Sequence, residues 1–285
     1  MIMHSNIHTF IGFEDLFENA KGVLFGAPFD GTTSFKPGAR FAPNAMREDS
    51  WALESYSPYL DKNLEDLSLC DIGDIELPFG NKGKALRLIE QTAQTIIAQH
   101  KVPIMIGGEH LVSYAAISAL HKKHPNLHLL HFDAHTDLRE EYLEEKLSHA
   151  TVIRRIWDML GDNKIFQFCI RSGLKEEFEW AKQHTHLEKF IFSTLPSIVQ
   201  KLQNQPIYIT IDLDVLDPSI FPGTGTPEPG GISFHEMMNI IQELSKLNNV
   251  VGFDLVELSP KYDHSGISTA AAAKILRELT LAVVH

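Results

Sequence analysis

Short apolar runs and longer amphipathic segments alternate along the whole chain. Six of the short runs are almost entirely apolar, which is typical of strands buried on both faces of a sheet. They lie at residues 22–27, 102–108, 127–133, 164–170, 206–212 and 249–257. Between most of these runs the apolar positions recur with the period of a helix, so the pattern predicts strands that alternate with helices.

Two of the amphipathic segments carry clear helix signals. One apolar stripe consists of Leu86, Ile89, Ala93, Ile96 and Ile97. Ser233 and Glu236 form a capping-box pattern at the start of a helix predicted over residues 234–247. Repeated strand–helix–strand units favour right-handed crossovers and a mainly parallel sheet covered by helices on both sides. We therefore predict a single three-layer α/β domain over residues 1–285.

Potential metal ligands stand at the ends of three predicted strands. They are Glu109 and His110, then Asp133, His135 and Asp137, and finally Asp212 and Asp214. Ligands of parallel sheets bind beyond the carboxyl ends of the strands, so all seven are expected at one edge. A spacing of two puts side chains on one face of an extended chain. At Asp137 the chain has already left the strand and this geometry is looser.

Clustered carboxylates at this edge require compensating charge. Two like charges about 4 Å apart repel by roughly 4 kcal/mol at an effective dielectric constant of about 20. Imidazole and carboxylate ligands without thiolates disfavour a structural zinc site and suit manganese, and their number fits two ions with shared carboxylates. Alone, a D-x-H or D-x-D pattern is more often a cap, a turn or a surface ion pair, but their occurrence together with GGEH favours a metal centre. His128 and His131 lie deeper in their strand and are interpreted as packing or hydrogen-bonding residues.

Composition narrows the possible partners. The chain has 37 acidic and 25 basic residues and a net charge of -12, which disfavours nucleic acid or anionic lipid and favours a cationic substrate. Cys70 and Cys169 match no metal or redox spacing, so buried free thiols are expected. The first twenty residues lack a signal-peptide pattern, and no uninterrupted apolar stretch of about 18 residues follows. We predict a cytoplasmic protein that does not enter a membrane.

Eight segments of the chain resemble the ureohydrolase family of arginases and agmatinases. They are GAPFDGTTSFKPGARFAP (26–43), LESYSPYLD (53–61), GGEH (107–110), FDAHTDLR (132–139), SHAT (148–151), DLDVLDP (212–218), GTGTPEPGG (223–231) and DLVELSP (254–260). The resemblance covers nearly the whole chain. It implies a three-layer α/β/α fold around an eight-stranded, mainly parallel sheet, a binuclear manganese centre, and assembly into homotrimers or homohexamers.

The resemblance also implies a ligand set for two Mn²⁺ ions per subunit. His110 and Asp137 would complete one site, His135 and Asp214 the other, and Asp133 and Asp212 would bridge the two. All six family ligands are present. The implied reaction is hydrolysis of a guanidinium group to urea and an amine by a hydroxide that bridges the metals.

Further roles follow from the same resemblance. Glu257 would pair with the guanidinium group, although a single glutamate considered alone is more often part of an ion pair. His149 would carry protons to the departing amine, and Asp137 would orient the hydroxide. Thr226 and Glu228, in the glycine-rich loop at 223–231, are expected near the substrate or the metal ligands.

The segment after DAHTD bears on the choice of substrate. Arginase-like chains carry an asparagine-rich loop here, whereas this chain continues LREEYLEEKLSHAT, whose four glutamates disfavour a substrate carboxylate and suit a terminal amine. The chain looks most like the bacterial agmatinases, which convert agmatine to putrescine and urea.

Three alternatives remain open. A ureohydrolase for guanidinobutyrate or arginine would use Arg139 or Arg40 to meet the carboxylate. A two-metal phosphoesterase would need further histidine ligands and lacks the D-L-D pair. A non-catalytic metal-binding member of the fold is disfavoured by the complete ligand set together with His149 and Glu257.

Overall fold

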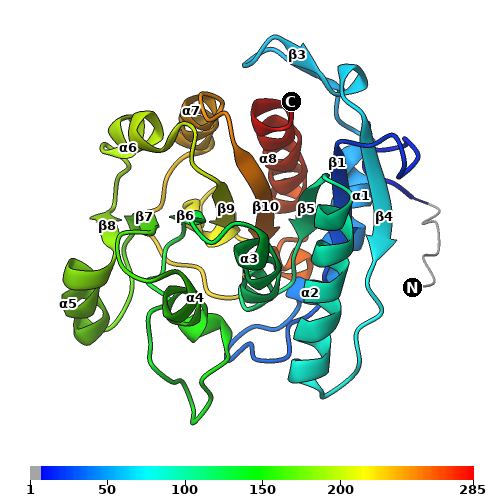
Figure 1. Cartoon of the computed structure of the whole chain (residues 1–285). Helices are drawn as coiled ribbons and strands as arrows, with labels where there is room; N and C mark the ends of the chain where they lie inside the picture. The colour runs from blue at the N-terminus through cyan, green and yellow to red at the C-terminus, as the bar shows by residue number, and fades with distance from the viewer. Residues whose placement is uncertain (1–7) are drawn as a thin grey trace.

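A central sheet of eight strands organises residues 8–285, the part of the chain described by the computed structural model (Figure 1). The strand order is β4-β1-β5-β10-β9-β6-β7-β8, and every neighbouring pair is parallel. The strands are β1 (Gly22–Gly26), β4 (Leu69–Asp74), β5 (Val102–Ile106), β6 (His128–Phe132), β7 (Ile165–Ile170), β8 (His186–Lys189), β9 (Ile207–Asp212) and β10 (Val250–Val256). A separate antiparallel pair is formed by β2 (Tyr56–Ser57) and β3 (Lys62–Asn63).

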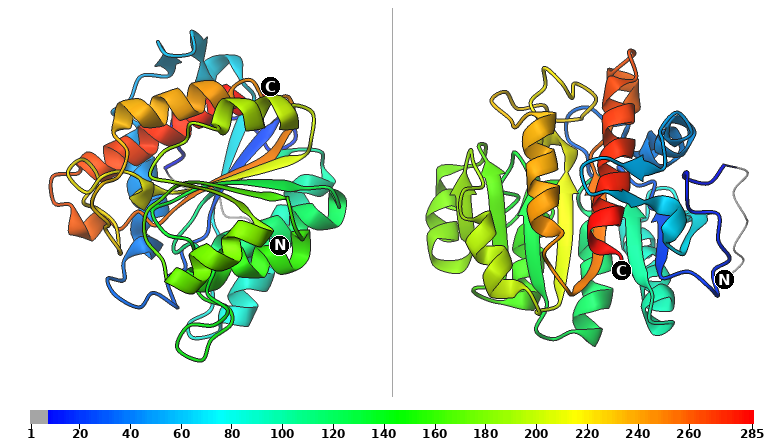
Figure 2. Two further views of the ribbon diagram at one scale, coloured as in Figure 1. Left: turned by 90° about the vertical axis from the view of Figure 1, so that its left-hand side faces the viewer. Right: turned by 90° about the horizontal axis from the view of Figure 1, so that it is seen from above.

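Helices cover both faces of the sheet, as the edge-on view in Figure 2 shows. One face carries α1 (Ala42–Ser50), α6 (Leu195–Leu202), α7 (Phe234–Leu244) and α8 (Ile267–Val283). The other carries α2 (Lys82–Ala98), α3 (Val112–Lys123), α4 (Val152–Leu160) and α5 (Lys175–His184). The predicted three-layer α/β architecture is confirmed, and all six predicted strands are present.

The inner strands are apolar throughout because each face meets its own helical layer. In β1, Leu24 belongs to one core, whereas Val23 and Phe25 belong to the other. Burial of both sets of side chains supplies the main driving force for assembling the layers.

The predicted helix signals are also confirmed. The five-residue apolar stripe is the buried face of α2. Ser233 Oγ accepts a hydrogen bond of 3.2 Å from Glu236 N, and the Glu236 carboxylate accepts one of 2.8 Å from Ser233 N. These two reciprocal bonds form the predicted capping box at the start of α7. This helix ends at Leu244, three residues earlier than predicted.

The cysteines and the helices of residues 8–285 bear on two predictions made from composition. Both cysteines are free and buried, as predicted. None of the helices in this range is long and apolar enough to cross a membrane. The absence of a signal-peptide pattern was inferred from the first twenty residues, of which residues 1–7 lie outside the described range.

Candidate metal centre and substrate pocket

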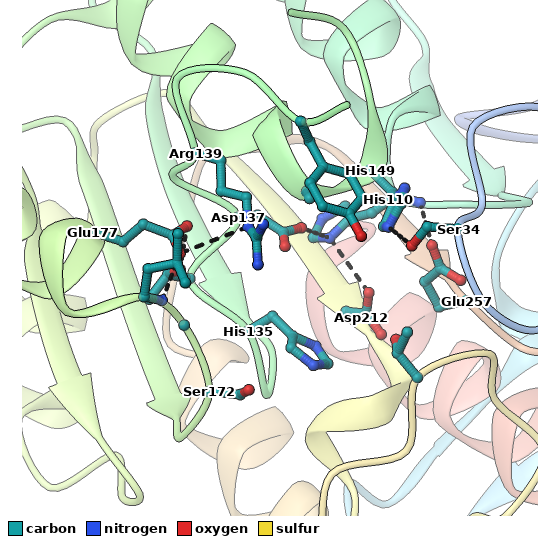
Figure 3. A pocket seen from close by; sticks show the side chains of 16 residues that line it. Ser34, His110, His135, Asp137, Arg139, His149, Ser172, Glu177, Asp212 and Glu257 are labelled. Atoms are coloured by element: carbon teal, nitrogen blue, oxygen red, sulfur yellow. Dashed lines mark hydrogen bonds and ion pairs between the residues drawn. The ribbon is translucent and has the colours of Figure 1, made fainter. Parts of the chain in front are cut away.

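Four adjacent strands, β5, β10, β9 and β6, deliver the predicted residues to one edge of the sheet. A pocket of about 300 Å³ opens there (Figure 3). Its lining includes seven predicted residues: His110, His135, Asp137, His149, Asp212, Thr226 and Glu257. Asp133 and Asp214 are buried and do not line it.

The His110 ring faces three carboxylates. Its Nδ1 lies 3.2 Å from Asp133 Oδ2, 3.1 Å from Asp137 Oδ2 and 3.4 Å from Asp212 Oδ2. Three carboxylate oxygens, from the segment after β6 and the end of β9, therefore lie within 3.4 Å of this one nitrogen.

Hydrogen bonds behind His110 define which ring nitrogen carries the proton. The Thr210 hydroxyl donates to Asp254 Oδ1 at 2.6 Å, and this uses its only proton. Thr210 Oγ1 must therefore accept from His110 Nε2, which is 3.0 Å away. The neutral imidazole then has a bare lone pair on Nδ1, a buried atom without a hydrogen-bond partner. Tyr208 holds the other oxygen of Asp254 with a hydrogen bond of 2.6 Å.

This arrangement fits a bound divalent cation. Ligand atoms about 2.1 Å from an octahedral ion lie about 3 Å from one another along each edge, close to the distances around His110 Nδ1. In the neutral ring the Nδ1 lone pair is repelled by the carboxylate oxygens, and either a bound cation or a proton on Nδ1 relieves the repulsion. Support of a ligand histidine by a hydroxyl and a carboxylate behind it is also typical of metal sites.

A second group of potential ligands shares Asp133. The ligand atoms of Asp133, His135 and Asp214 lie within 4.8 Å of one another. His135 Nδ1 is 2.9 Å from Asp214 Oδ2 and 3.6 Å from Asp133 Oδ1. Asp133 thus directs one oxygen toward His110 and the other toward His135, as a bridging carboxylate would.

His131 lies close to the same carboxylate but is engaged at both nitrogens. Gln167 Nε2 lies 3.1 Å from Nδ1, and Nε2 lies 2.7 Å from Asp133 Oδ2. With the amide donating to Nδ1, the proton of a neutral ring sits on Nε2 and no lone pair is left for a metal. The hydrogen-bonding interpretation of His131 is confirmed.

The pKa values of the clustered residues are shifted by burial and by the neighbouring carboxylates. Burial, aided by Asp133, raises the pKa of Asp137 to about 7. Burial and the neighbouring Asp214 raise the pKa of Asp212 well above its usual value. Burial lowers the pKa of His110, but the surrounding carboxylates outweigh this effect and raise it. A bound cation would relieve the repulsion that these shifts express.

Two residues of the pocket have left-handed backbone conformations. The φ angles are 51° at Asp137 and 65° at Glu257, and such a conformation costs a non-glycine residue about 1–2 kcal/mol. Neighbouring backbone holds both in place. Asp137 O accepts from Ile153 N at 3.1 Å at the start of α4, and Glu257 N donates to Gly108 O at 2.9 Å.

Glu257 and His149 reach the pocket from separate segments. Glu257 Oε1 accepts from the backbone N–H of His110 at 2.8 Å, and burial raises the pKa of this carboxyl well above its usual value. His149 Nε2 lies 3.2 Å from Ser34 Oγ. Burial lowers the pKa of His149 to about 4, so its imidazole is neutral near pH 7.

The glycine-rich loop supplies one of its two predicted residues. Thr226 lines the pocket and donates to Asp214 Oδ2 at 3.3 Å. The Glu228 side chain is not part of the lining. Its backbone carbonyl instead accepts from Arg171 Nη2 at 2.7 Å, so a role for its carboxylate stays a prediction.

The wall opposite Glu257 contains residues that carry no sequence motif (Figure 3). Glu177, from α5, accepts from Thr136 Oγ1 at 2.7 Å, from Leu138 N at 3.0 Å and from Leu174 N at 2.7 Å. Tyr142, Ser172 and Leu174 also line the pocket, whereas Ser34, from the segment 26–43, lines it beside Glu257 and His149. Only the folded chain brings these positions together.

The glutamate-rich segment does not contact the pocket as a cluster. Its members Glu140, Glu141, Glu144 and Glu145 are all exposed and absent from the lining. Arg139 lines the pocket instead, with Cζ 4.6 Å from the Tyr142 ring centroid and Nε 3.9 Å from Glu177 Oε2. Any effect of the four glutamates on the substrate is therefore long-range and screened by solvent.

Comparison with known proteins decides the family. The sequence model of the arginase family matches residues 20–282. The chain belongs to the arginase family. The agmatinase of Bacillus subtilis (strain 168) is 48% identical over 279 residues, which are 97% of this chain and 96% of that protein. The human mitochondrial guanidino acid hydrolase is 34% identical over 279 residues, covering 93% of this chain and 79% of that one.

Solved structures agree with this arginase-family membership. A protein from Clostridium difficile is 54% identical and superposes with a TM-score of 0.93, covering 94% of this chain and 99% of that one. The predicted resemblance and the predicted hydrolase class are confirmed, and the ligand clusters can hold metal ions.

Proposed function

We propose that this arginase-family enzyme hydrolyses agmatine to putrescine and urea with two manganese ions bound per subunit. The observation that carries the proposal is a pair of ligand groups that share Asp133, beside a pocket that Glu257 also lines. The similarity to an agmatinase over nearly the full length of both chains supports the choice of agmatine.

The proposed ligands divide between two sites. His110 and Asp137 belong to the first, His135 and Asp214 to the second, and Asp133 and Asp212 to both. Oxygen and imidazole donors without thiolates suit manganese. Bound divalent cations would supply hydroxide near neutral pH, since they lower the pKa of water from 15.7 towards about 7.

The remaining residues bind and orient the substrate. Glu257 uses one carboxylate oxygen to accept from His110 N, which leaves the other to pair with a guanidinium N–H through a charge-assisted bond. Such pairing holds the guanidinium carbon in a fixed position for attack. Asp137 accepts a hydrogen bond from the nucleophile and thereby orients it.

His149 moves the proton that the leaving amine requires. Its imidazole borders the pocket and is neutral near pH 7, so it would take up the proton released by the attacking water only transiently and pass it on to the departing nitrogen. Ser34 Oγ, 3.2 Å from Nε2, keeps the ring directed along the pocket wall. Thr226 supports the second site through its hydrogen bond to Asp214.

A carboxylate-bearing substrate such as guanidinobutyrate is the second candidate. Arg139 lies in the pocket wall, where a guanidinium group could meet a carboxylate, and one relative is a guanidino acid hydrolase. Agmatine is preferred because the relative named agmatinase is more similar, at 48% against 34% identity.

The decisive experiment measures urea release by the manganese-loaded protein. Agmatine, arginine and guanidinobutyrate are supplied in parallel, and bound manganese is counted on the same sample. We expect agmatine to give the highest kcat/KM and the metal count to approach two per subunit. Equal or faster turnover of guanidinobutyrate or arginine would replace agmatine as the substrate, and no urea from any of them would remove the hydrolase proposal.

Cellular location and assembly are part of the same proposal. Two buried free cysteines fit a reducing compartment, and we propose the cytoplasm. A homotrimer or homohexamer is proposed from the family resemblance, and light scattering of the purified protein tests it.

A further inference from the structure

Glu109 is a buried carboxylate that the proposed chemistry does not use. It directly precedes His110, and its side chain is fully shielded from solvent. Burying a carboxylate is costly unless donors compensate it. We infer that Glu109 positions His149 by fixing the hydroxyl of Thr32. This inference rests on the proposed function in one respect, namely that His149 takes part in turnover.

The donors to Glu109 all come from one turn. Thr32 N donates to Oε2 at 2.8 Å, Thr32 Oγ1 donates to Oε1 at 2.5 Å, and Thr33 Oγ1 donates to Oε2 at 3.2 Å. The carboxylate therefore holds residues 31–34 against the end of β5 rather than facing the ligand cluster.

Backbone contacts place this turn directly on the GGEH segment. Glu109 N donates to Phe29 O at 2.7 Å. At Gly108 an added Cβ would lie 1.8 Å from Phe29 O, so only glycine allows this approach. The backbone of Phe29 thus fixes the start of the turn, and the Glu109 side chain fixes Thr32 and Thr33 further along it.

The same turn contacts His149 at several atoms. Thr32 has a single hydroxyl proton, which it gives to Glu109, so its oxygen is an acceptor for the backbone N–H of His149 at 3.1 Å. Thr32 Oγ1 also lies 3.5 Å from Nδ1 of the His149 ring, and Ser34 Oγ lies 3.2 Å from Nε2. Because the Thr32 hydroxyl points its proton at Glu109, a lone pair of Thr32 Oγ1 is directed at the backbone N–H of His149.

Thr33 provides a matched control within the same turn. Its hydroxyl also donates to Glu109, but among residues 8–285 the hydrogen bonds to His149 from this turn come from Thr32 and Ser34 and not from Thr33. A purely structural role for Glu109 would make Thr32→Val and Thr33→Val similar. A positioning role makes only the first affect turnover.

The test compares variants of the manganese-loaded enzyme. Thr32→Val should lower kcat by roughly 10-fold or more and leave KM within about twofold, because small displacements of a catalytic group can cost up to about 100-fold. Glu109→Gln, which replaces one acceptor oxygen by a donor, should lower kcat in the same way. Thr32→Ser should restore it, and Thr33→Val should stay near the parent. Manganese content should not change, and the thermal midpoint should fall by similar amounts in Thr32→Val and Thr33→Val, because each removes one hydroxyl donor from the buried Glu109 carboxylate.

A double variant links the effect to His149. Thr32→Val combined with His149→Ala should turn over no more slowly than His149→Ala alone, since residues acting through one group are not additive. An additive loss, a Thr32→Val enzyme with parental kcat, or a failure of Thr32→Ser to restore it would overturn the inference. So would a loss of manganese in Thr32→Val, or a kcat that falls equally in Thr32→Val and Thr33→Val.

A readout without turnover separates this inference from the proposed function. With ¹³C-labelled histidine, the His149 ring signal is assigned by its disappearance in His149→Ala. It should shift in Thr32→Val and Glu109→Gln but not in Thr33→Val. If the parent releases no urea, the proposed function fails while this measurement still tests the contact, and unchanged ring signals would refute it.

Discussion

The floor and the rim of the pocket are built in different ways. We use pocket floor for His110, Asp137, Asp212 and Glu257, and pocket rim for residues 139–145. The floor residues stand at strand ends, are buried, and are held by hydrogen bonds of defined direction. The rim is largely exposed, and its charged side chains pair with single partners at the surface.

This difference separates chemistry from substrate choice. At the floor a lost contact leaves a buried group unsatisfied, which costs about 1–3 kcal/mol or more for a charge. At the rim, exposed pairs such as Glu140 with Arg154 contribute only about 0–1 kcal/mol. Substitutions at the rim should therefore disturb the floor little.

Substitution at the floor should have the largest effect. Asp212→Asn removes a charge that faces His110 Nδ1 at 3.4 Å. We expect manganese binding and urea release to fall together, by more than the roughly 100-fold typical of losing a residue behind a ligand. Metal analysis and kcat/KM check this. A variant that keeps two tightly bound ions would contradict the proposed bridging role of Asp212.

An intermediate effect is expected for Asp254→Asn, because Asp254 contacts the floor residue His110 only through Thr210. The amide can present a donor to Thr210, whose hydroxyl would then donate to His110 Nε2 and move the ring proton to Nδ1. Manganese affinity should fall by about 10- to 100-fold, measured by the metal dependence of the thermal midpoint. Tyr208→Phe is the control, because it removes a bond to Asp254 and leaves the Thr210 contact intact. Equal losses in both variants would argue against control through Thr210.

The smallest effect is expected at the rim. Arg139→Gln removes a positive charge from the pocket wall, which should favour the cationic agmatine and disfavour guanidinobutyrate. The interaction is partly solvated, because the Arg139 side chain is 33% exposed, so we expect a KM change of about 3- to 10-fold in opposite directions for the two substrates. Parallel KM measurements check this. A large fall in kcat would show instead that Arg139 belongs with the floor.

Much of the fold follows from local pattern, but the edges of the sheet do not. The six predicted strands are apolar because both faces are covered. Strand β4 reads LCDIGD, and the charge of its buried Asp71 is met by Arg47 of α1, which donates to it at 2.7 Å and 3.0 Å. Strand β8 reads HLEK and stays partly exposed at the sheet edge. Hydrophobic periodicity reveals neither the pairing of Asp71 with Arg47 nor the edge position of β8.

The candidate site divides in the same way. The D-x-H and D-x-D pairs predicted that Asp133, His135, Asp212 and Asp214 gather at one edge, and they do. The expected extended geometry is wrong, because β6 ends at Phe132 and Asp214 lies in the short 3-10 helix Leu213–Val215 that follows β9. Glu177 is one of several glutamates in its helix, and no local signal distinguishes it. It is held in the pocket wall by Leu174 N at the start of its own helix and by two donors from another segment, Thr136 and Leu138. Thr32 and Glu109 likewise meet across 77 positions of sequence.

The left-handed backbone at Asp137 and Glu257 also bears on how the sequence evolves. Glycine at either position would relieve about 1 kcal/mol of conformational cost, and so would raise the stability of the folded chain. It would also delete a carboxylate from the pocket. Both acids therefore stand where the backbone favours glycine, and if they act as proposed, stability and activity set opposite preferences at these two positions.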